Sequence, residues 1–293
     1  MSKVEMWQLE QRQRLPVPLK IRMSEKRIID WYNHWNGNVY ISFSGGKDST
    51  VLLNIVRSLY KDVPAVFVDT GLEFPEIREF VKTIDNVEWI KPKKTFKTVI
   101  DKYGYPIISK ETALKIEEIR TTKSDKLRRK RFSGDANGNG MLSKKWRYLL
   151  DAPFKISSKC CDVMKKTPVK KYERDTGRKP FVGSMAVDSR RRAMSYLQKG
   201  CNSFDVKRPM STPIAFWKEE DIWYYLKNNG ISYCNIYDKG YERTGCMFCM
   251  FGVHLNSENK FKRMKGTHPK LWNYCINKLE LGKVLDYVKV PYE

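Results

Sequence analysis

The chain has 293 residues, enough for one α/β domain with appendages or for two small domains, and its formal net charge is +23. No apolar run approaches membrane-spanning length, and residues 1–6 lack the apolar core of a signal peptide, so we expect a cytoplasmic protein with no membrane partner. A field this positive attracts polyanions, although a lysine-rich composition can raise the charge without any functional role.

Residues 1–38 are polar and aromatic, and residues 24–35 predict an amphipathic helix. Serine is favoured at the N-cap position, so we expect this helix to begin at Ser24. We interpret residues 1–37 as a helical extension that leads into the first strand.

A glycine-containing turn follows the first predicted strand. Residues 39–43 are β-branched and aromatic, which predicts a buried strand, and apolar residues recur at helical spacing from Ser49. The two glycines allow the backbone N–H groups to approach a ligand, and the helix that follows offers its positive end to an anion. Lys47 adds a cation, and Asp48 is suited to hold Mg²⁺. The candidate nucleotide-binding residues here are Ser42, Ser44, Gly45, Gly46, Lys47, Asp48, Ser49 and Thr50.

This turn is too short for the common G-x-x-x-x-G-K-[ST] phosphate loop. Ser-Gly-Gly-Lys-Asp-Ser after a strand resembles instead the pyrophosphate loop of the PP-loop ATP pyrophosphatase superfamily. That resemblance implies an adenine nucleotide α-hydrolase-like fold, ATP and Mg²⁺ as ligands, and cleavage of ATP between the α and β phosphates. An ordinary turn between a strand and a helix is the alternative.

Further strands are predicted at residues 64–69, 87–92 and 179–184, with a helix at 77–84. Their alternation predicts the α/β class, with a doubly wound parallel sheet and a ligand at the carboxyl ends of its strands. Two segments that follow strands extend the candidate nucleotide site: Val68, Asp69, Thr70 and Gly71, expected against adenine and ribose, and Asp188, Ser189, Arg190, Arg191 and Arg192.

The composition becomes strongly basic after a helix predicted at 112–120. We interpret residues 121–149 as a flexible basic insertion, with a glycine-rich loop at 134–140. A solvated helix face and a nucleic-acid contact surface both fit this composition. The candidate nucleic-acid-binding residues are Lys126, Arg128, Arg129, Lys130, Arg131, Lys144, Lys145 and Arg147.

Four of the seven cysteines form two groups. Cys160 and Cys161 are adjacent, before a basic helix predicted at 162–175, and Cys246 and Cys249 form a C-x-x-C pair in a cysteine-rich C-terminal region. Four thiolates suit an Fe–S cluster or zinc, although adjacent side chains diverge and fit a single tetrahedral ion poorly. Incidental buried thiols are the third alternative, and this is also our expectation for Cys201, Cys234 and Cys275.

An adjacent cysteine pair joined to a distant C-x-x-C is similar to the arrangement in assimilatory APS reductases, in which all four residues hold one 4Fe–4S cluster. The resemblance extends to the residues 159–168, 208–225 and 241–249, which match motifs of the PAPS reductase family. It covers residues 38–252, which we therefore interpret as a PP-loop ATPase or PAPS reductase-like domain. Residues 253–293 are then a C-terminal helical segment, with a helix predicted at 269–279.

Three departures from the family pattern bear on the activity. The pyrophosphate loop is intact, and residues 286–293 lack the Glu-Cys-Gly-x-His motif of sulfonucleotide reductases. Both features favour ATP cleavage and bring the chain closer to the DNA phosphorothioation ATPases, which are similar to PAPS reductases. Met185 replaces the first arginine of the superfamily pattern G-x-R-x-x-[ED]-S-x-x-R, a phosphate contact that is either lost or supplied by Arg190 or Arg191.

The resemblance implies an ATP pyrophosphatase that adenylates an acceptor for sulfur transfer, with Lys47, Asp48 and Arg192 as catalytic residues. Charge alone suggests DNA or tRNA as the acceptor. One candidate for the sulfur donor is a cysteine desulfurase. One candidate for the assembly is a homodimer. Two other functions stay open. One is an APS/PAPS reductase that releases sulfite, and the other is a non-catalytic nucleic-acid-binding or scaffold protein with a structural cluster.

Overall fold

The computed structural model describes residues 4–293, which divide into two compact units that interleave along the chain. The first unit comprises the residues up to 69 together with 74–91 and 169–244, and the second comprises 70–73, 92–168 and 245–293. These units are defined by contacts between residues in space, whereas the predicted domains 1–37, 38–252 and 253–293 are continuous stretches of the sequence. No helix between residues 4 and 293 has the length and apolar character needed to cross a membrane.

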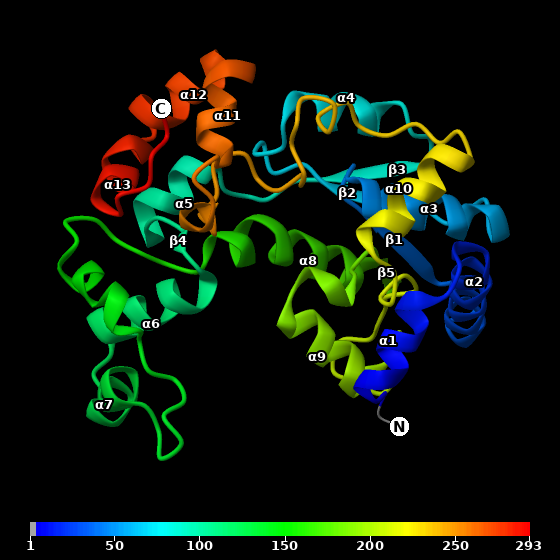
Figure 1. Ribbon diagram of the computed structural model, residues 1–293, viewed down its shortest axis with the longest axis horizontal. Coiled ribbons are helices and arrows are strands. Elements are labelled where there is room, and N and C mark those ends of the chain that lie inside the picture. Colours follow the sequence, from blue (N-terminus) through cyan, green and yellow to red (C-terminus); the bar gives the residue numbers. More distant parts are fainter. Residues whose placement is uncertain (1–3) are drawn as a thin grey trace. The chain divides into compact units, whose positions relative to one another are not determined.

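A mostly parallel sheet forms the centre of the first unit. Its strand order is β3-β2-β1-β5-β7-β6, in which only β6 runs antiparallel to its neighbour (Figure 1). The predicted α/β class is confirmed, and the predicted strands lie where the sequence puts them, with slightly shorter bounds. The strands are β1 (Val39–Phe43), β2 (Ala65–Val68), β3 (Val87–Ile90), β5 (Lys179–Val182), β6 (Asn202–Ser203) and β7 (Met210–Ser211).

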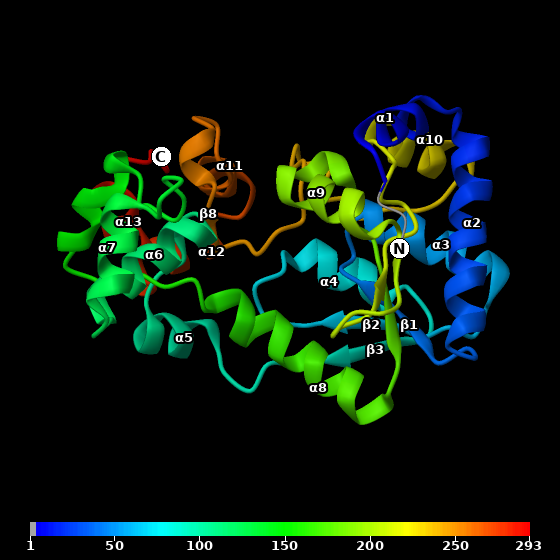
Figure 2. The ribbon, with the colours of Figure 1, turned by 90° about the horizontal axis from the view of Figure 1, so that it is seen from below.

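Helices cover both faces of this sheet. On one face Tyr172 of α8 packs against Tyr40 of β1 and Val66 of β2, while α3 and α2 lie on the other face (Figure 2). A 3₁₀ turn at Ala186–Asp188 leads into α9. The helices are α1 (Met6–Arg14), α2 (Val17–His34), α3 (Lys47–Leu59), α4 (Pro75–Lys82), α8 (Thr167–Thr176), α9 (Arg190–Lys199) and α10 (Glu219–Asn228).

The predicted start of a helix at Ser24 is wrong, because α2 begins at Val17. Pro18 lies in its first turn, where the missing N–H costs no hydrogen bond. Ser24 is instead buried inside the helix, where its hydroxyl donates to the Pro213 carbonyl at 3.0 Å and accepts from the Trp217 indole at 3.0 Å.

The second unit is mainly helical, with one pair of short parallel strands, β4 (Ile107–Ile108) and β8 (Met250–Phe251). The predicted basic insertion contains α7 and a 3₁₀ segment at Lys144–Asp151, and a third 3₁₀ turn lies at Val253–Leu255. Two predicted helices contain a π-helical turn, at Asp162–Lys166 before α8 and at Tyr274–Lys278 after α12. The α-helices are α5 (Phe96–Tyr103), α6 (Lys110–Thr121), α7 (Asp125–Ser133), α11 (Lys260–Thr267), α12 (Pro269–Asn273) and α13 (Leu281–Tyr287).

A buried ion pair joins α2 to α10 in the first unit. Lys20 Nζ lies 2.6 Å from Asp221 Oδ2, and the two side chains are 1% and 7% exposed. Replacing Lys20 by methionine keeps the apolar stem but leaves a buried carboxylate without its cation. We expect Lys20→Met to lower the free energy of unfolding by about 3–5 kcal/mol, measured by urea denaturation.

The matched control is Lys97→Met, which breaks the exposed pair between Lys97 and Asp101 on α5. Its expected cost is below about 1 kcal/mol, because both side chains stay in water. Equal losses in the two variants would show that the pair between α2 and α10 is not part of the stabilising core.

Candidate functional site

Glycine is required at two places near the start of α3, one in the turn after β1 and one at the end of β5. Gly45 has φ +70°, and a Cβ there would lie 2.8 Å from side-chain methyl groups of both Ile77 and Val81. At the end of β5, a Cβ on Gly183 would lie 3.1 Å from the carbonyl oxygen of Asp48. The missing side chain at Gly45 therefore lets the turn pack against α4, and the one at Gly183 lets the end of β5 approach the start of α3.

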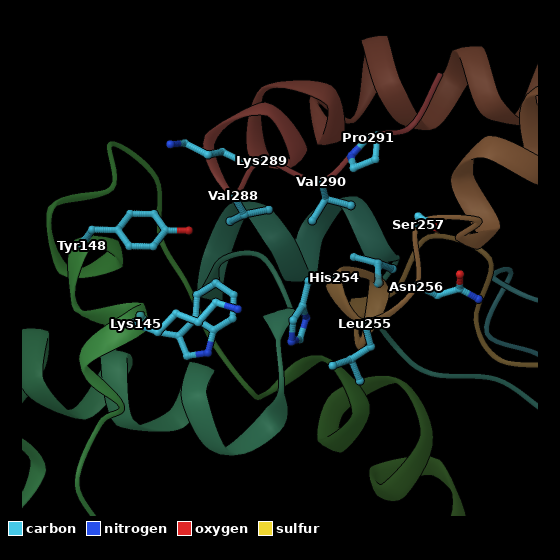
Figure 3. Close-up of a pocket in the computed structure, with 12 residues that line it drawn as sticks. Lys145, Tyr148, His254, Leu255, Asn256, Ser257, Val288, Lys289, Val290 and Pro291 are labelled. Atoms are coloured by element: carbon cyan, nitrogen blue, oxygen red, sulfur yellow. The ribbon is translucent and has the colours of Figure 1, made fainter.

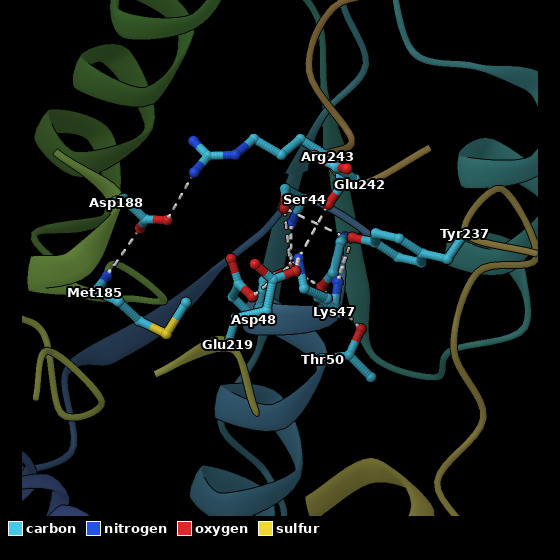
Figure 4. Close-up of polar contacts among 12 residues, drawn as sticks. Ser44, Lys47, Asp48, Thr50, Met185, Asp188, Glu219, Tyr237, Glu242 and Arg243 are labelled. Atoms are coloured by element: carbon cyan, nitrogen blue, oxygen red, sulfur yellow. Dashed lines mark hydrogen bonds and ion pairs between the residues drawn. The ribbon is translucent and has the colours of Figure 1, made fainter. Parts of the chain in front are cut away.

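The backbone N–H groups of this turn are bonded to hydroxyl groups of the chain itself. Ser44 donates to Ser49 Oγ at 3.2 Å, Gly46 donates to Ser44 Oγ at 3.3 Å, and Lys47 donates to the Tyr237 hydroxyl at 2.8 Å (Figure 4). A phosphate oxygen can replace a hydroxyl as the acceptor of each bond, and it is the stronger acceptor because it is charged. The turn thus presents amides aimed for an anion at the N-terminus of α3.

Lys47 is held by residues from two distant parts of the chain. Its Nζ donates to the Glu242 carbonyl at 3.1 Å and lies 3.1 Å from Glu219 Oε1 of α10. The ring of Tyr237 lies beneath it, with the centroid 5.2 Å from Nζ. The side chain is only 5% exposed, so the ammonium group is already removed from bulk water.

Asp48 has the unsatisfied acceptor of this site. Its Oδ1 is buried and accepts no hydrogen bond from residues 4–293, and the nearest cation, Lys47 Nζ, is 3.9 Å away. Burial raises the pKa of this carboxyl; Lys47 opposes the effect, and the Asp188 carboxylate adds to it. A buried carboxylate oxygen without a donor is a suitable ligand for a hard divalent cation, so the residues present fit Mg²⁺.

A second acidic residue, Asp188, lies beside the turn and forms ion pairs with two arginines. Its carboxylate pairs with Arg192 of α9. It also accepts the Met185 N–H at 3.2 Å, as Figure 4 shows. Arg243 Nη2 lies 3.6 Å from the other oxygen. Two guanidinium groups therefore stand at the carboxyl end of β5, close to Met185.

Sequence reasoning missed Arg243, and it left open whether the contact of the missing arginine is lost or supplied by Arg190 or Arg191. Both of those residues are exposed on α9, whereas Ser189 caps the helix by accepting the Arg192 N–H at 3.3 Å. Arg243 stands at a position that the motif in residues 241–249 leaves open, so only its place beside the motif residues could have drawn attention to it. Tyr237 and Glu219 had no such signal.

The remaining candidates for nucleotide contact lie in both units. Ser42 and Val68 are half-buried in β1 and β2, and Asp69 is buried beside Arg78 at 3.1 Å and Lys91 at 3.8 Å. These pairs give Asp69 a structural role in the first unit. Thr70 and Gly71 belong to the second unit, where the Thr70 hydroxyl donates to Glu73 at 2.8 Å.

The second unit brings the four grouped cysteines into one small pocket. All seven cysteines are free of disulfide bonds, and only the two pairs line this pocket. Cys160 and Cys161 precede the π-helical turn, a distortion frequent at functional sites, while the C-x-x-C pair precedes β8. The other lining residues are Lys165 and the apolar Leu72, Phe96, Pro106, Met164 and Phe251.

Burial and mutual repulsion make thiolates unfavourable in this pocket. Burial raises the pKa of Cys160, and the three neighbouring thiols raise it further. Burial also raises the pKa of Cys246, against the lowering effect of Lys165. Burial lowers the pKa of Lys260, a cation missed by sequence reasoning, whose Nζ donates to the Cys246 carbonyl at 2.8 Å.

Within residues 4–293, no three His, Cys, Asp or Glu side chains are already spaced to surround a metal ion. The four thiols nevertheless share an apolar pocket in which their ionised form lacks sufficient positive charge. Cysteine sulfurs are the usual ligands of Fe–S clusters, whose irons would supply that charge. This donor set therefore fits an Fe–S cluster.

The candidate cations of the basic insertion differ in exposure, and two of the exposed ones also pair with carboxylates, Arg128 with Asp125 and Lys130 with Asp135. Arg131 bonds to Glu118 and to the Gly140 carbonyl, and Arg147 bonds to the Phe132 carbonyl and covers its ring. These two side chains hold the insertion together. The exposed candidates are Lys126, Arg128, Arg129, Lys130, Lys144 and Lys145.

Comparison with known proteins identifies a family for most of the chain. Residues 38–122 and 108–251 match the phosphoadenosine phosphosulfate reductase domain. An uncharacterized protein of Methanocaldococcus jannaschii is 30% identical over 247 residues, which cover 82% of this chain but 41% of that protein. The chain thus spans less than half the length of this relative.

Two named enzymes are more distant. The adenosine 5'-phosphosulfate reductase of Anoxybacillus flavithermus is 22% identical over 267 residues, or 89% of this chain and 94% of that enzyme. The phosphoadenylyl-sulfate reductase structure from Candida auris, a phosphate complex, aligns with a TM-score of 0.46 and 16% identity, covering 84% of this chain and 97% of that one.

The glycine turn gives a prediction about stability. We expect Gly45→Ala to lower the free energy of unfolding by about 1–3 kcal/mol more than Gly200→Ala, because Ile77 and Val81 cannot yield space for the added methyl group. Gly200 is the matched control, since its φ of +68° imposes a similar backbone strain but a Cβ there meets open space. Urea denaturation measures both, and equal costs would exclude tight packing of the turn against α4.

Proposed function

The chain belongs to the phosphoadenosine phosphosulfate reductase domain family, and from that premise we propose that it cleaves ATP between the α and β phosphates to adenylate an acceptor for sulfur transfer. The observation that carries this proposal is the turn from Ser44 to Thr50. It combines backbone amides at a helix N-terminus with a buried lysine and a carboxylate oxygen that lacks a donor. A triphosphate with its divalent cation would satisfy all three.

In this reaction an oxygen of the acceptor attacks the α-phosphorus of ATP. The bond from the α-phosphorus to the bridging oxygen breaks, and its electron pair leaves with pyrophosphate. Lys47 and the amides of the turn stabilise the negative charge that grows on the leaving group. Arg192 and Arg243, both at Asp188, are the cations available for the α-phosphate.

Binding would exchange partners within the site. Lys47 would give up Glu219 and the Glu242 carbonyl for phosphate oxygens, and the Lys47 amide would give up the Tyr237 hydroxyl. Asp48 would hold Mg²⁺, which supplies charge neutralisation of the departing pyrophosphate. Because the polar groups of the turn are already oriented, the exchange requires little reorganisation.

The second half of the proposal is sulfur transfer. A sulfur nucleophile, delivered as a persulfide by a cysteine desulfurase or another donor, attacks the adenylated atom of the acceptor. The bond from that atom to oxygen breaks, and AMP leaves with the electron pair. A second thiolate then attacks the donor sulfur of the resulting S–S bond, so that a new disulfide forms and the acceptor leaves with its sulfur. Cys160, Cys161, Cys246 and Cys249 would hold a 4Fe–4S cluster, which supplies one-electron redox chemistry when bound.

Nucleic acid is the acceptor class that charge favours. The net charge of +23 and the exposed lysines and arginines of residues 126–145 support an anionic polymer as partner. The proposal takes DNA or tRNA as the acceptor and a homodimer as the assembly.

Reduction of a sulfonucleotide is the second candidate, favoured by the activity printed for the Anoxybacillus flavithermus relative. It would need a nucleophilic cysteine outside the four-thiol pocket. Burial raises the pKa of Cys234 to about 11 and that of Cys275 to about 12, which leaves little thiolate at neutral pH. Thioredoxin-dependent release of sulfite from APS, lost on replacing either residue, would establish this function in place of ours.

The first test of the proposal is pyrophosphate release. Lys47→Ala and Asp48→Ala should each slow release of pyrophosphate from ATP by about 10²–10³-fold, because each removes charge compensation at the leaving group. The assay compares ATP alone with ATP plus DNA or tRNA, and nucleic acid should stimulate the wild-type rate. Lys97→Ala, an exposed lysine of α5, is the control. Unchanged rates in the Lys47 and Asp48 variants would refute the assignment of this turn.

The second test concerns the thiol pocket. Protein purified without oxygen should carry iron and inorganic sulfide and should absorb visible light, and Cys160→Ser should lose all three. Cys275→Ser should keep them, because Cys275 is buried outside the pocket and a serine hydroxyl can also donate to the Trp272 carbonyl. Colourless wild-type protein with stoichiometric zinc would contradict the cluster.

A further inference from the structure

The second unit contains a cavity of about 550 Å³ that the proposed reaction does not use (Figure 3). Three separate segments line it: the 3₁₀ segment at residues 145–148, residues 253–257 after β8, and residues 288–291 near the C-terminus. A volume of this size is typical of sites that bury a small organic group. The cavity is therefore large enough to be a candidate binding site for such a group.

A second cavity, also about 550 Å³, adjoins the first. Trp146, His254 and Leu255 line both cavities, and we call these three shared side chains the ridge. Leu255 is 80% exposed, unusually so for a large apolar side chain. We use the name base groove for the two cavities together with this ridge.

The charge of the base groove has one sign. Its lining includes Lys110, Lys145 and Lys289 and, in both cavities, no aspartate or glutamate. Lys145 Nζ lies 4.9 Å from the centroid of the Trp146 ring, so an ammonium group stands beside an aromatic face. Lysines close to an aromatic ring match a ligand that carries both phosphates and planar rings.

His254 supplies a polar group without a protein partner. Its ring meets the Trp146 ring edge to face, with centroids 5.0 Å apart, and its Nδ1 is buried with no hydrogen-bond partner among residues 4–293. Burial and the nearby Lys145 lower the pKa of His254, so the imidazole is neutral at physiological pH. A neutral imidazole adds an uncharged planar ring beside Trp146, and both rings are of the kind on which unpaired bases stack.

We propose that the base groove binds single-stranded nucleic acid, with unpaired bases on either side of the ridge formed by Trp146, His254 and Leu255 and the phosphates along Lys110, Lys145 and Lys289. This rests on the proposed function only in taking nucleic acid to be the anionic partner. Paired bases in a duplex expose no free faces, so the ridge selects single strands. The exposed cations of α7 extend the basic surface, since Arg147 joins the 3₁₀ segment to α7 through the Phe132 carbonyl.

The test is binding of a short fluorescein-labelled single strand of DNA, measured by polarisation with no ATP present. Leu255→Asp should weaken binding about tenfold, because it places a negative charge where a base stacks. Leu114→Asp on α6 changes the net charge equally but lies outside both cavities, so it should leave the affinity at the wild-type value. Leu255 is mostly exposed, so its replacement should not disturb folding.

Two further probes separate single-strand recognition from general attraction. The same strand annealed to its complement should bind more weakly than the single strand and should be insensitive to Leu255→Asp. A strand carrying 5-iodouracil should crosslink, on irradiation, to peptides that contain residues 144–148 or 253–257. Equal effects of the two leucine variants, or crosslinks confined to other peptides, would overturn the proposal.

The outcome is independent of the ATP reaction. Loss of single-strand binding with intact pyrophosphate release would refute the base groove and leave the proposed reaction standing. Binding that depends on Leu255, in a protein that cleaves no ATP with any acceptor, would refute the reaction and leave the base groove standing.

Discussion

The first unit depends on close packing around the start of α3 that two glycines make possible. Gly45 turns with positive φ against Ile77 and Val81, and Gly183 lets the end of β5 reach the Asp48 carbonyl. A side chain larger than hydrogen at Gly45 would push the turn away from α4, and one at Gly183 would push the start of α3 away from β5. This one constraint sets the first turn of α3, and with it the directions of Lys47 and the backbone amides.

Around that turn the chain satisfies most polar groups but leaves one charge incompletely balanced. Hydroxyl and carbonyl groups hold the amides and Lys47, all of them partners that an anion can replace. Asp48 Oδ1 is the exception, since it is buried without a donor. A buried acceptor in this state costs free energy, which a bound cation would recover. The site is thus arranged for an anion and a cation together.

The thiol pocket of the second unit has the same imbalance with other atoms. Four thiols converge in apolar surroundings where their ionisation is unfavourable, although Lys165 and Lys260 lie close to them. At Asp48 and at the four cysteines, the nearby cations of the protein do not fully balance the charge of the ionised side chains. In each, the chemistry of the donor atoms indicates the kind of cation that fits: hard and oxygen-seeking at Asp48, thiophilic at the cysteines.

The sequence by itself determined the α/β class, the strands β1, β2, β3 and β5, the glycine turn and the grouping of the cysteines. These features are encoded by the spacing of apolar, glycine and cysteine residues over short stretches, so a local pattern is enough to find them. It did not determine the start of α2, because Lys20 reads as a surface residue until Asp221 is brought against it from 201 residues away. Nor did it identify Tyr237 and Glu219 beside Lys47, or separate Arg131 and Arg147 from the exposed cations. Only the tertiary structure decided these pairings, because a buried charge takes the partner that folding brings within a few ångströms, and no local pattern records that distance.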